Sequence, residues 1–264
     1  MKKSGKEYGI GKLKKLRLAL DVIKNNKKVH SLSHWQQQLA MIDQIFKIPK
    51  ALDGYVVECG CFNGASTVNL SLACAMVKRS LIVCDSFEGL PDPGKSEKFE
   101  VRAGSKDYYS WEKNDFAALG GLNGVKKNVS TYGNIYVCEF VKGYFENTLK
   151  PLEEGGKIPE GKVVFVFEDA DLVSSVKDCL VNLWPKMQDG CRFYSHEPWS
   201  TGVVSIFYDK AFWNEKIGQD PPGFFGSGCG ICEGISKLSI GYSEKFDKDK
   251  ILASGQKRLY EWGR

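Results

Sequence analysis

The sequence lacks an apolar run of membrane-spanning length, and no signal-peptide pattern opens it. It also lacks internal repeats, low-complexity segments and basic residues interleaved with aromatics, which argues against a nucleic-acid groove. The nine cysteines are an odd number, and Cys59, Cys84 and Cys138 fall inside apolar segments. We therefore predict reduced core cysteines in a cytoplasmic protein, with neither a disulfide framework nor a membrane span.

The residues that are present have the composition of an ordinary soluble globular protein, with 42% hydrophobic and 26% charged residues. A chain of 264 residues can bury one full core and carry additions to it. The net charge of +5 is mild, and much of it lies in the first 28 residues. We divide the chain into an N-terminal helical segment, 1–50, and an α/β domain, 51–264.

The N-terminal segment predicts two helices. Apolar residues recur at helical spacing on one face of the first, namely Leu13, Leu16, Leu20 and Ile23. This basic helix could lie on a membrane surface or contact a second copy, which leaves a homo-oligomer open; we favour packing on its own domain. The second helix is predicted over residues 33–46, and His30 and His34 near its start are assigned no role beyond surface or capping positions.

The remaining chain is organised around a strand, a glycine turn and a helix start within residues 55–67. The apolar run ends in Glu58, Gly60 and Gly64 follow, and the helix is predicted to open near Ser66. Glycines let the backbone approach a ligand, and a helix N-terminus offers unpaired N–H groups, so the pattern is typical of a nucleotide-type cradle. Its spacing differs from the dinucleotide fingerprint, and similar turns occur without any ligand.

A second apolar run, residues 80–84, ends in Asp85, about twenty residues beyond the glycine turn. An acid at the end of the second strand of a βαβ unit suits bidentate hydrogen bonding to ribose hydroxyls. A solvated acid at a strand end would explain Asp85 alone, but not Asp85 together with the glycine turn. The two features together favour a site for a nucleoside-containing cofactor.

Three later segments predict further strands: 135–140, 163–167 and 191–195. The five apolar residues of the second are typical of a parallel strand buried on both faces. Four acids and a histidine follow two of these strands, namely Glu168, Asp169, Asp171, His196 and Glu197. Because the carboxyl ends of parallel strands meet at one edge of a sheet, we expect these side chains to lie close together.

The polar segment 94–130 follows a strand end and carries scattered aromatics, so it is a candidate lid over a pocket or else a disordered surface loop. Helices are predicted over 174–184 and beyond residue 198, and a late strand over 237–242. Cys229 and Cys232 form one C-x-x-C pair. Without a second pair, we favour a packed loop or hairpin over a zinc or redox site.

Four segments read together resemble a known family. They are E-C-G at 58–60, D-S-F-E-G-L-P at 85–91, G-Y-F-E-N-T-L at 143–149 and D-A-D-L at 169–172. The chain is similar over roughly residues 35–215 to the macrocin O-methyltransferases, which use S-adenosylmethionine to methylate sugar hydroxyls of macrolides and related glycosides. The resemblance implies a Rossmann-like class I methyltransferase fold, α/β, with a seven-stranded, mostly parallel sheet and helices on both faces.

The resemblance also implies a cofactor site. Glu58, Gly60 and Gly64 would shape the turn beneath the methionine part of S-adenosylmethionine, and Ser66 would hold its carboxylate. The remaining cofactor-binding positions are Asp85 and Ser86 at the ribose, and Tyr144 and Phe145 beside the adenine. Binding of S-adenosylmethionine rather than NAD is therefore expected.

Asp169 matches the family's first metal-binding acid, and the paired aspartates that follow the next strand in the family fall here on His196 and Glu197. The tyrosine after D-x-D-L is replaced by Val173. Histidine suits Mg²⁺ less well than oxygen ligands do, so Mg²⁺ or another divalent metal would be held by Asp169, His196 and Glu197 in an altered site. Asp169 and His196 are the catalytic candidates, with His196 as an alternative base.

The expected activity is transfer of a methyl group from S-adenosylmethionine to a sugar hydroxyl of a glycoside or saccharide. One alternative is a methyltransferase for a non-sugar small-molecule hydroxyl, with the 94–130 insertion setting the acceptor. The other is a cofactor-binding interaction module without catalysis, which the altered metal positions favour. The expected partner is a small molecule, with no nucleic acid.

Overall fold

The computed structural model of the protein describes residues 4–101, 108–150, 157–225 and 240–246. In these residues the core is a sheet in the order β5-β2-β1-β6-β7-β8, with a separate hairpin, β3-β4. The strands of the sheet are β1 Tyr55–Cys59, β2 Leu81–Asp85, β5 Cys138–Lys142, β6 Val163–Glu168, β7 Met187–Ser195 and β8 Gly241–Glu244. Only β8 runs antiparallel to its neighbour, β7.

The predicted α/β fold is confirmed, because the sheet is mostly parallel and lies between helices, and two of its inner strands are buried along their whole length. Every residue of β2 and β6 is buried, as the apolar runs predict for strands covered on both faces. The predicted number of strands differs: the described residues form six strands of the main sheet instead of seven. No helix among these residues is long and apolar enough to cross a membrane.

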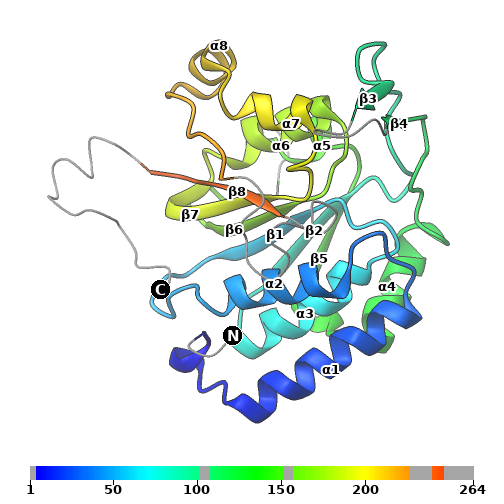
Figure 1. The fold of residues 1–264 in the computed structure, drawn as a ribbon. Helices are drawn as coiled ribbons and strands as arrows, with labels where there is room; N and C mark the ends of the chain where they lie inside the picture. Colours follow the sequence, from blue (N-terminus) through cyan, green and yellow to red (C-terminus); the bar gives the residue numbers. More distant parts are fainter. Residues whose placement is uncertain (1–3, 102–107, 151–156, 226–239, 247–264) are drawn as a thin grey trace, which may run out of the picture.

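Helices cover both faces of the sheet (Figure 1). On one side lie α1 Lys12–Lys28, α2 Trp35–Ile45, α3 Ala65–Val77 and α4 Gly121–Tyr132. On the other lie α5 Phe145–Thr148, α6 Val173–Leu183, α7 Thr201–Ile206 and α8 Lys210–Phe212, which continues as a π-helical turn, Trp213–Ile217. Because α1 and α2 both pack on α3, the N-terminal segment joins the core of the α/β part, and the division at residue 50 stays a prediction.

The buried face of α1 is not the predicted one. Leu13, Leu16 and Leu20 are exposed, whereas the buried positions are Lys15, Leu18, Val22 and Asn25. Polar contacts fix this orientation: Asn25 Nδ2 donates to Asn69 Oδ1 at 2.9 Å, and Asn69 Nδ2 donates to Gln38 Oε1 at 2.5 Å. Paired buried amides thus orient the helix, although its other face carries more leucines.

The start of α2 is capped by His34, as the sequence suggested for a histidine at this place. His34 Nδ1 accepts a hydrogen bond from Gln36 N–H at 3.4 Å, and its own N–H donates to Gln37 Oε1 at 2.8 Å. This reciprocal arrangement is a capping box. It fixes the side chain of Gln37, whose amide nitrogen lies 3.0 Å from His196 Nε2.

The 94–130 insertion is partly regular structure. It contains the strands β3 Phe99–Val101 and β4 Tyr108–Ser110 and most of α4. The alternative of a disordered surface loop is therefore wrong for these described parts. Trp111, directly after β4, is 5% exposed and packs in a small cluster with Leu90 and Leu172. Closure of this segment over a pocket stays a prediction.

Smaller corrections concern element boundaries. The predicted strand at 135–140 begins later, because residues 135–137 form a 3₁₀ turn capped by the Asn134 side chain, which accepts from Tyr136 N–H at 3.1 Å. Within the described residues the late strand is Gly241–Glu244, and residues 237–239 of its predicted range lie outside them. Cys229 and Cys232 lie outside the described residues, and the described cysteines are free thiols.

Candidate active site

A cavity of about 750 Å³ lies at the carboxyl ends of β1, β2 and β6. This is the edge at which open α/β sheets bind ligands. The predicted site residues on its wall are Gly60, Ser66, Asp85, Ser86, Tyr144, Phe145, Asp169 and His196, together with Asp171. Glu58, Gly64 and Glu197 are not on the wall.

The glycine turn holds β1, β6 and α3 close together. Gly60 has φ 85°, and a Cβ there would lie 1.9 Å from the Asp169 carbonyl oxygen, so only glycine fits. Gly64, with φ 82°, precedes the first turn of α3, and a Cβ would meet Val125 Cγ1 at 2.8 Å. The turn therefore brings backbone to the cavity with the N-terminus of α3 beside it.

Glu58 supports this turn from inside the core. Its side chain is fully buried, Oε2 accepts from Thr67 Oγ1 at 2.6 Å, and Oε1 has no hydrogen-bond partner among the described residues. Burial raises the pKa of Glu58 to about 8, although the hydroxyls of Ser66 and Thr67 oppose the rise. Glu58 thus holds the start of α3 and does not reach the cavity.

Asp85 ties the end of β2 to the glycine turn. Its Oδ2 accepts from the N–H groups of Cys61 and Phe62 at 2.7 and 3.3 Å, and its Oδ1 accepts from Phe87 N–H at 2.5 Å. Burial raises the pKa of this carboxyl, and the amide donors oppose the rise. Because each carboxylate oxygen has two acceptor positions, Oδ1 can still accept from a ligand hydroxyl.

The neighbouring loop and the next strand complete this side of the cavity. Ser86 Oγ donates to the Gly89 carbonyl at 2.7 Å and accepts from Glu88 N–H at 3.0 Å, so Ser86 stabilises the loop after β2. Tyr144 and Phe145 follow β5 at the start of α5 and line the same cavity. The structure thus places the two predicted aromatics beside the predicted ribose acid.

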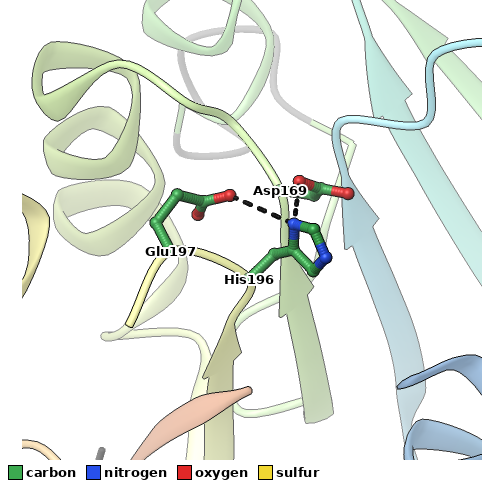
Figure 2. A group of neighbouring side chains, drawn as sticks. All are labelled: Asp169, His196 and Glu197. Carbon is green, nitrogen blue, oxygen red and sulfur yellow. Dashed lines mark ion pairs between the residues drawn. The ribbon is translucent and has the colours of Figure 1, made fainter. Parts of the chain in front are cut away.

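Figure 2 shows Asp169, His196 and Glu197 at the ends of β6 and β7. His196 Nδ1 lies 2.9 Å from Asp169 Oδ1 and 3.6 Å from Glu197 Oε1. One ligand-type atom from each residue lies within 4.8 Å of the others, so the strand-end residues are brought together as predicted. Asp171 lines the cavity with φ 59° but lies outside this group.

The contacts of His196 indicate one tautomer. The Gln37 carbonyl Oε1 accepts from His34 N–H, so the amide nitrogen of Gln37 faces His196 Nε2 at 3.0 Å. That nitrogen can only donate, which makes Nε2 the acceptor and places the ring proton on Nδ1, toward Asp169. Burial lowers the pKa of His196, but the Asp169 carboxylate outweighs it and the net direction is upward. The Gln37 donor opposes protonation of Nε2.

Behind His196 lie two carboxyl groups with no exposed surface, Glu168 and Glu197. Burial raises the pKa of Glu168 to about 7, and burial together with the charge of Glu168 raises the pKa of Glu197 well above its usual value. Glu197 Oε1 is buried without a hydrogen-bond partner among the described residues. An unpaired buried oxygen beside an acid and an imidazole fits a divalent-ion site.

Another part of the wall is aromatic. The ring centroid of Trp111 lies 5.8 Å from that of Phe116 and 6.5 Å from that of Trp199, and all three residues line the cavity. Trp111 and Phe116 come from the insertion, while Trp199 follows β7. The insertion therefore contributes an apolar surface to the same cavity that holds the strand-end acids.

Sequence reasoning missed the part of the wall that comes from the N-terminal segment. Residues 30–33 line the cavity. The ring centroid of His30 lies 5.5 Å from that of Phe62 in the glycine turn. It also missed Gln37 and Trp199. The capping position of Gln37 could be found from the sequence, but its contact with His196 depends on packing between distant segments.

Comparisons with known proteins agree with this geometry. The profile of the family described as Macrocin-O-methyltransferase (TylF) matches residues 31–194. Over 141 residues the chain is 30% identical to an 8-demethyl-8-(2,3-dimethoxy-alpha-L-rhamnosyl)-tetracenomycin-C 4'-O-methyltransferase of Streptomyces olivaceus, covering 52% of this chain and 50% of the relative. It is 28% identical, with the same coverage, to a demethyldecarbamoylnovobiocin O-methyltransferase of Streptomyces niveus. The matched part thus spans about half the length of each relative.

Two solved structures share the fold. The O-methyltransferase NovP superposes with a TM-score of 0.62 at 16% identity, covering 88% of this chain and 99% of its own. CalS11, a calicheamicin methyltransferase, superposes with a TM-score of 0.58 at 16% identity, covering 90% of this chain and 94% of its own. The family profile covers more than half of the chain, and the fold is that of a methyltransferase. The chain is therefore a member of the macrocin O-methyltransferase family.

Proposed function

We propose that the protein transfers the methyl group of S-adenosylmethionine to a sugar hydroxyl of a glycoside or saccharide. The observation that carries this proposal is the joining of two half-sites in one cavity. The glycine turn and Asp85 form one half, and Asp169 and His196, with Glu197 behind them, form the other. Family membership supports the same reaction.

In this proposal the cofactor lies along the ends of β1, β2 and β5. Ser66, at the start of α3, would receive the methionine carboxylate, since a helix N-terminus favours an anion. Asp85 and Ser86 would face the ribose, with Tyr144 and Phe145 beside the adenine. Gly60 would allow close approach of the backbone beneath the methionine part, with Glu58 and Gly64 holding the turn.

The charge of this edge suits a sulfonium cation. Strands β1, β2 and β6 each end at or next to a buried carboxyl, Glu58, Asp85 and Glu168, and Glu197 follows β7. Such groups in a low-dielectric site favour a positive ligand.

The methyl acceptor must lose a proton during transfer, and a sugar hydroxyl is only weakly acidic. Asp169, His196 and Glu197 would hold Mg²⁺ or a softer divalent ion once His196 Nδ1 has lost its proton, and the ion would supply acidification of the hydroxyl. Without an ion, His196 would accept the proton at Nε2 once the acceptor hydroxyl has displaced the Gln37 amide, while Asp169 keeps the ring oriented through Nδ1. Asp169 serves both arrangements, so its side chain is the one we expect to be indispensable.

The aromatic wall supports a glycosidic acceptor. Trp111, Phe116 and Trp199 line the cavity, and aromatic rings suit the C–H face of a sugar ring or an attached apolar group. One relative is named as the 4'-O-methyltransferase of a rhamnosyl-tetracenomycin and another as the O-methyltransferase of demethyldecarbamoylnovobiocin. We place the reaction in the cytoplasm, where the free cysteines would stay reduced.

The test is incubation with S-adenosylmethionine and pools of glycosides, followed by mass spectrometry for the gain of one methylene unit. Modified products in the glycoside pool and none in a matched pool of non-sugar alcohols support the proposal. Modified products in the pool of non-sugar alcohols and none in the glycoside pool favour a non-sugar hydroxyl as the acceptor. Cofactor binding with no product in either pool favours the interaction module without catalysis.

A further inference from the structure

The solvent face of α1 is both apolar and strongly basic. Leu13, Leu16 and Leu20 are 75%, 58% and 49% exposed, and they lie on the side opposite the buried residues Leu18 and Val22. Around them are exposed cations, namely Lys12, Lys14, Arg17, Lys24, Lys27 and Lys28. We call these nine residues the basic leucine face. Isolated exposed leucines are ordinary, but three on one face form a continuous patch.

The charge of the chain is divided between this helix and the rest. Residues 1–28 contain ten lysines and arginines and two acids, whereas the remaining 236 residues contain 27 and 30. The rest of the protein is therefore slightly acidic. A partner that complements the basic leucine face must be anionic and must also accept apolar side chains.

Two other partners fit less well. A second copy packed through the same face would bring cations against cations, because a symmetric contact places the same patch on both sides. A nucleic acid would contact the cations but would leave the leucines at the centre of the face without apolar surroundings, and the face has no aromatic residue for stacking.

We propose that α1 docks the protein on an anionic lipid surface. A helix of this kind lies in the plane of the interface, with its leucines at the boundary between headgroups and acyl chains. Lysine and arginine side chains extend from the helix edges toward acidic headgroups while their alkyl stems cover apolar surface. The chain passes from α1 directly to residues 30–33 on the cavity wall, so the docked helix adjoins the cavity.

Docking does not require α1 to leave its own domain. The residues that hold it, Leu18, Val22 and Asn25, point to the buried side, and Asn25 is hydrogen-bonded to Asn69. The basic leucine face is already formed in the folded protein. We therefore expect binding without unfolding of α1 from α3.

The experiment is sedimentation of the full-length protein with vesicles of phosphatidylcholine, with and without phosphatidylglycerol. We expect at least about tenfold stronger binding to the anionic vesicles, and loss of most binding when salt rises from about 0.1 M to about 1 M. The variant Leu13→Ser/Leu16→Ser/Leu20→Ser should bind at least about tenfold more weakly. The control Tyr136→Ser removes a side chain that is 96% exposed outside α1 and should bind like wild type.

Circular dichroism shows whether the triple variant keeps its fold, and Lys24→Glu/Lys28→Glu provides a second variant that leaves the leucines in place. Absence of vesicle binding by wild type, or equal binding to neutral vesicles, overturns the proposal. Sedimentation velocity that shows a dimer lost in the triple variant, without vesicle binding, would assign the face to a second copy. Preferential binding of a DNA duplex would assign it to nucleic acid.

Discussion

Gln37 and His196 are separated by 159 residues in the sequence, yet their side-chain nitrogens lie 3.0 Å apart. The capping box at the start of α2 holds the Gln37 carbonyl, so the amide nitrogen is the group that faces the imidazole. A helix of the N-terminal segment therefore decides which nitrogen of a strand-end histidine carries the proton. The tautomer in turn determines which ring nitrogen of His196 has the lone pair that can accept a proton or bind an ion.

Replacing Gln37 by leucine should release the ring of His196. We expect a mixture of tautomers in the nitrogen NMR spectrum of the histidine ring, where wild type shows the proton on Nδ1. Turnover should fall by about tenfold or more, because removal of an orienting partner commonly costs that much, while affinity for S-adenosylmethionine stays unchanged. The control is Gln36→Leu, one residue earlier on α2. An unchanged tautomer in Gln37→Leu would contradict this role.

Metal dependence separates the two arrangements at the strand ends. We expect Asp169→Asn to lose turnover under all conditions, because Asp169 Oδ1 contacts His196 and belongs to the candidate ion site. Turnover that resists a chelator and disappears in His196→Ala indicates that His196 is the base. Turnover that a chelator abolishes and Mg²⁺ or Mn²⁺ restores indicates the ion. Full activity in both variants would remove these strand ends from the chemistry.

The sequence was informative where function depends on residues close together in the chain. The glycine turn, Asp85 and the acids after β6 follow from short patterns, because the ends of parallel strands must share one edge. The orientation of α1 was not predictable in the same way. Both faces of that helix carry apolar residues at helical spacing, and the choice depended on Asn25 meeting Asn69 on another helix.

The same reason explains the missing part of the site. Residues 30–33 and Trp199 reach the cavity, and Gln37 reaches His196, only after the N-terminal helices pack on α3 and the insertion packs against Trp199. Nothing in their local sequence marks them as cavity residues. His34 shows the contrast, since capping depends on neighbours along the chain and was predictable.

The insertion should respond to ligands. Trp111 and Phe116 line the cavity, and the ring of Trp111 contacts those of Phe116 and Trp199, so bound cofactor and product should restrict residues 108–118. Hydrogen exchange is expected to be slower there with S-adenosylhomocysteine and methylated product than in the free protein. Amides of α6, packed on the sheet, serve as the internal control. Equal exchange of residues 108–118 in both states would mean that the insertion is a fixed wall.

Glu58 should make stability depend on pH. Because its pKa is raised from 4.5 to about 8 in the folded protein, its favourable contribution is complete below the unfolded value and is lost as pH rises toward 8. The free energy of unfolding should therefore fall between pH 5 and pH 9, by roughly 3–5 kcal/mol from this group. Glu58→Gln should remove most of that fall in urea titrations. Exposed Glu139→Gln is the control, and an equal fall in all three proteins would contradict the assignment.

Isothermal titration calorimetry can show whether the cavity binds S-adenosylmethionine with Asp85 at the ribose. We predict binding of S-adenosylmethionine and no binding of NAD. Asp85→Ala should weaken binding by roughly 1.5–3 kcal/mol, as expected for loss of hydrogen bonds to a charged group. Glu88→Ala removes an exposed acid of the same loop that does not line the cavity and should bind like wild type. Thermal unfolding of each variant checks that the turn anchored by Asp85 still folds. Wild-type protein that does not bind S-adenosylmethionine would show that the cavity is not a site for this cofactor. A folded Asp85→Ala variant with unchanged affinity would remove Asp85 from the ribose.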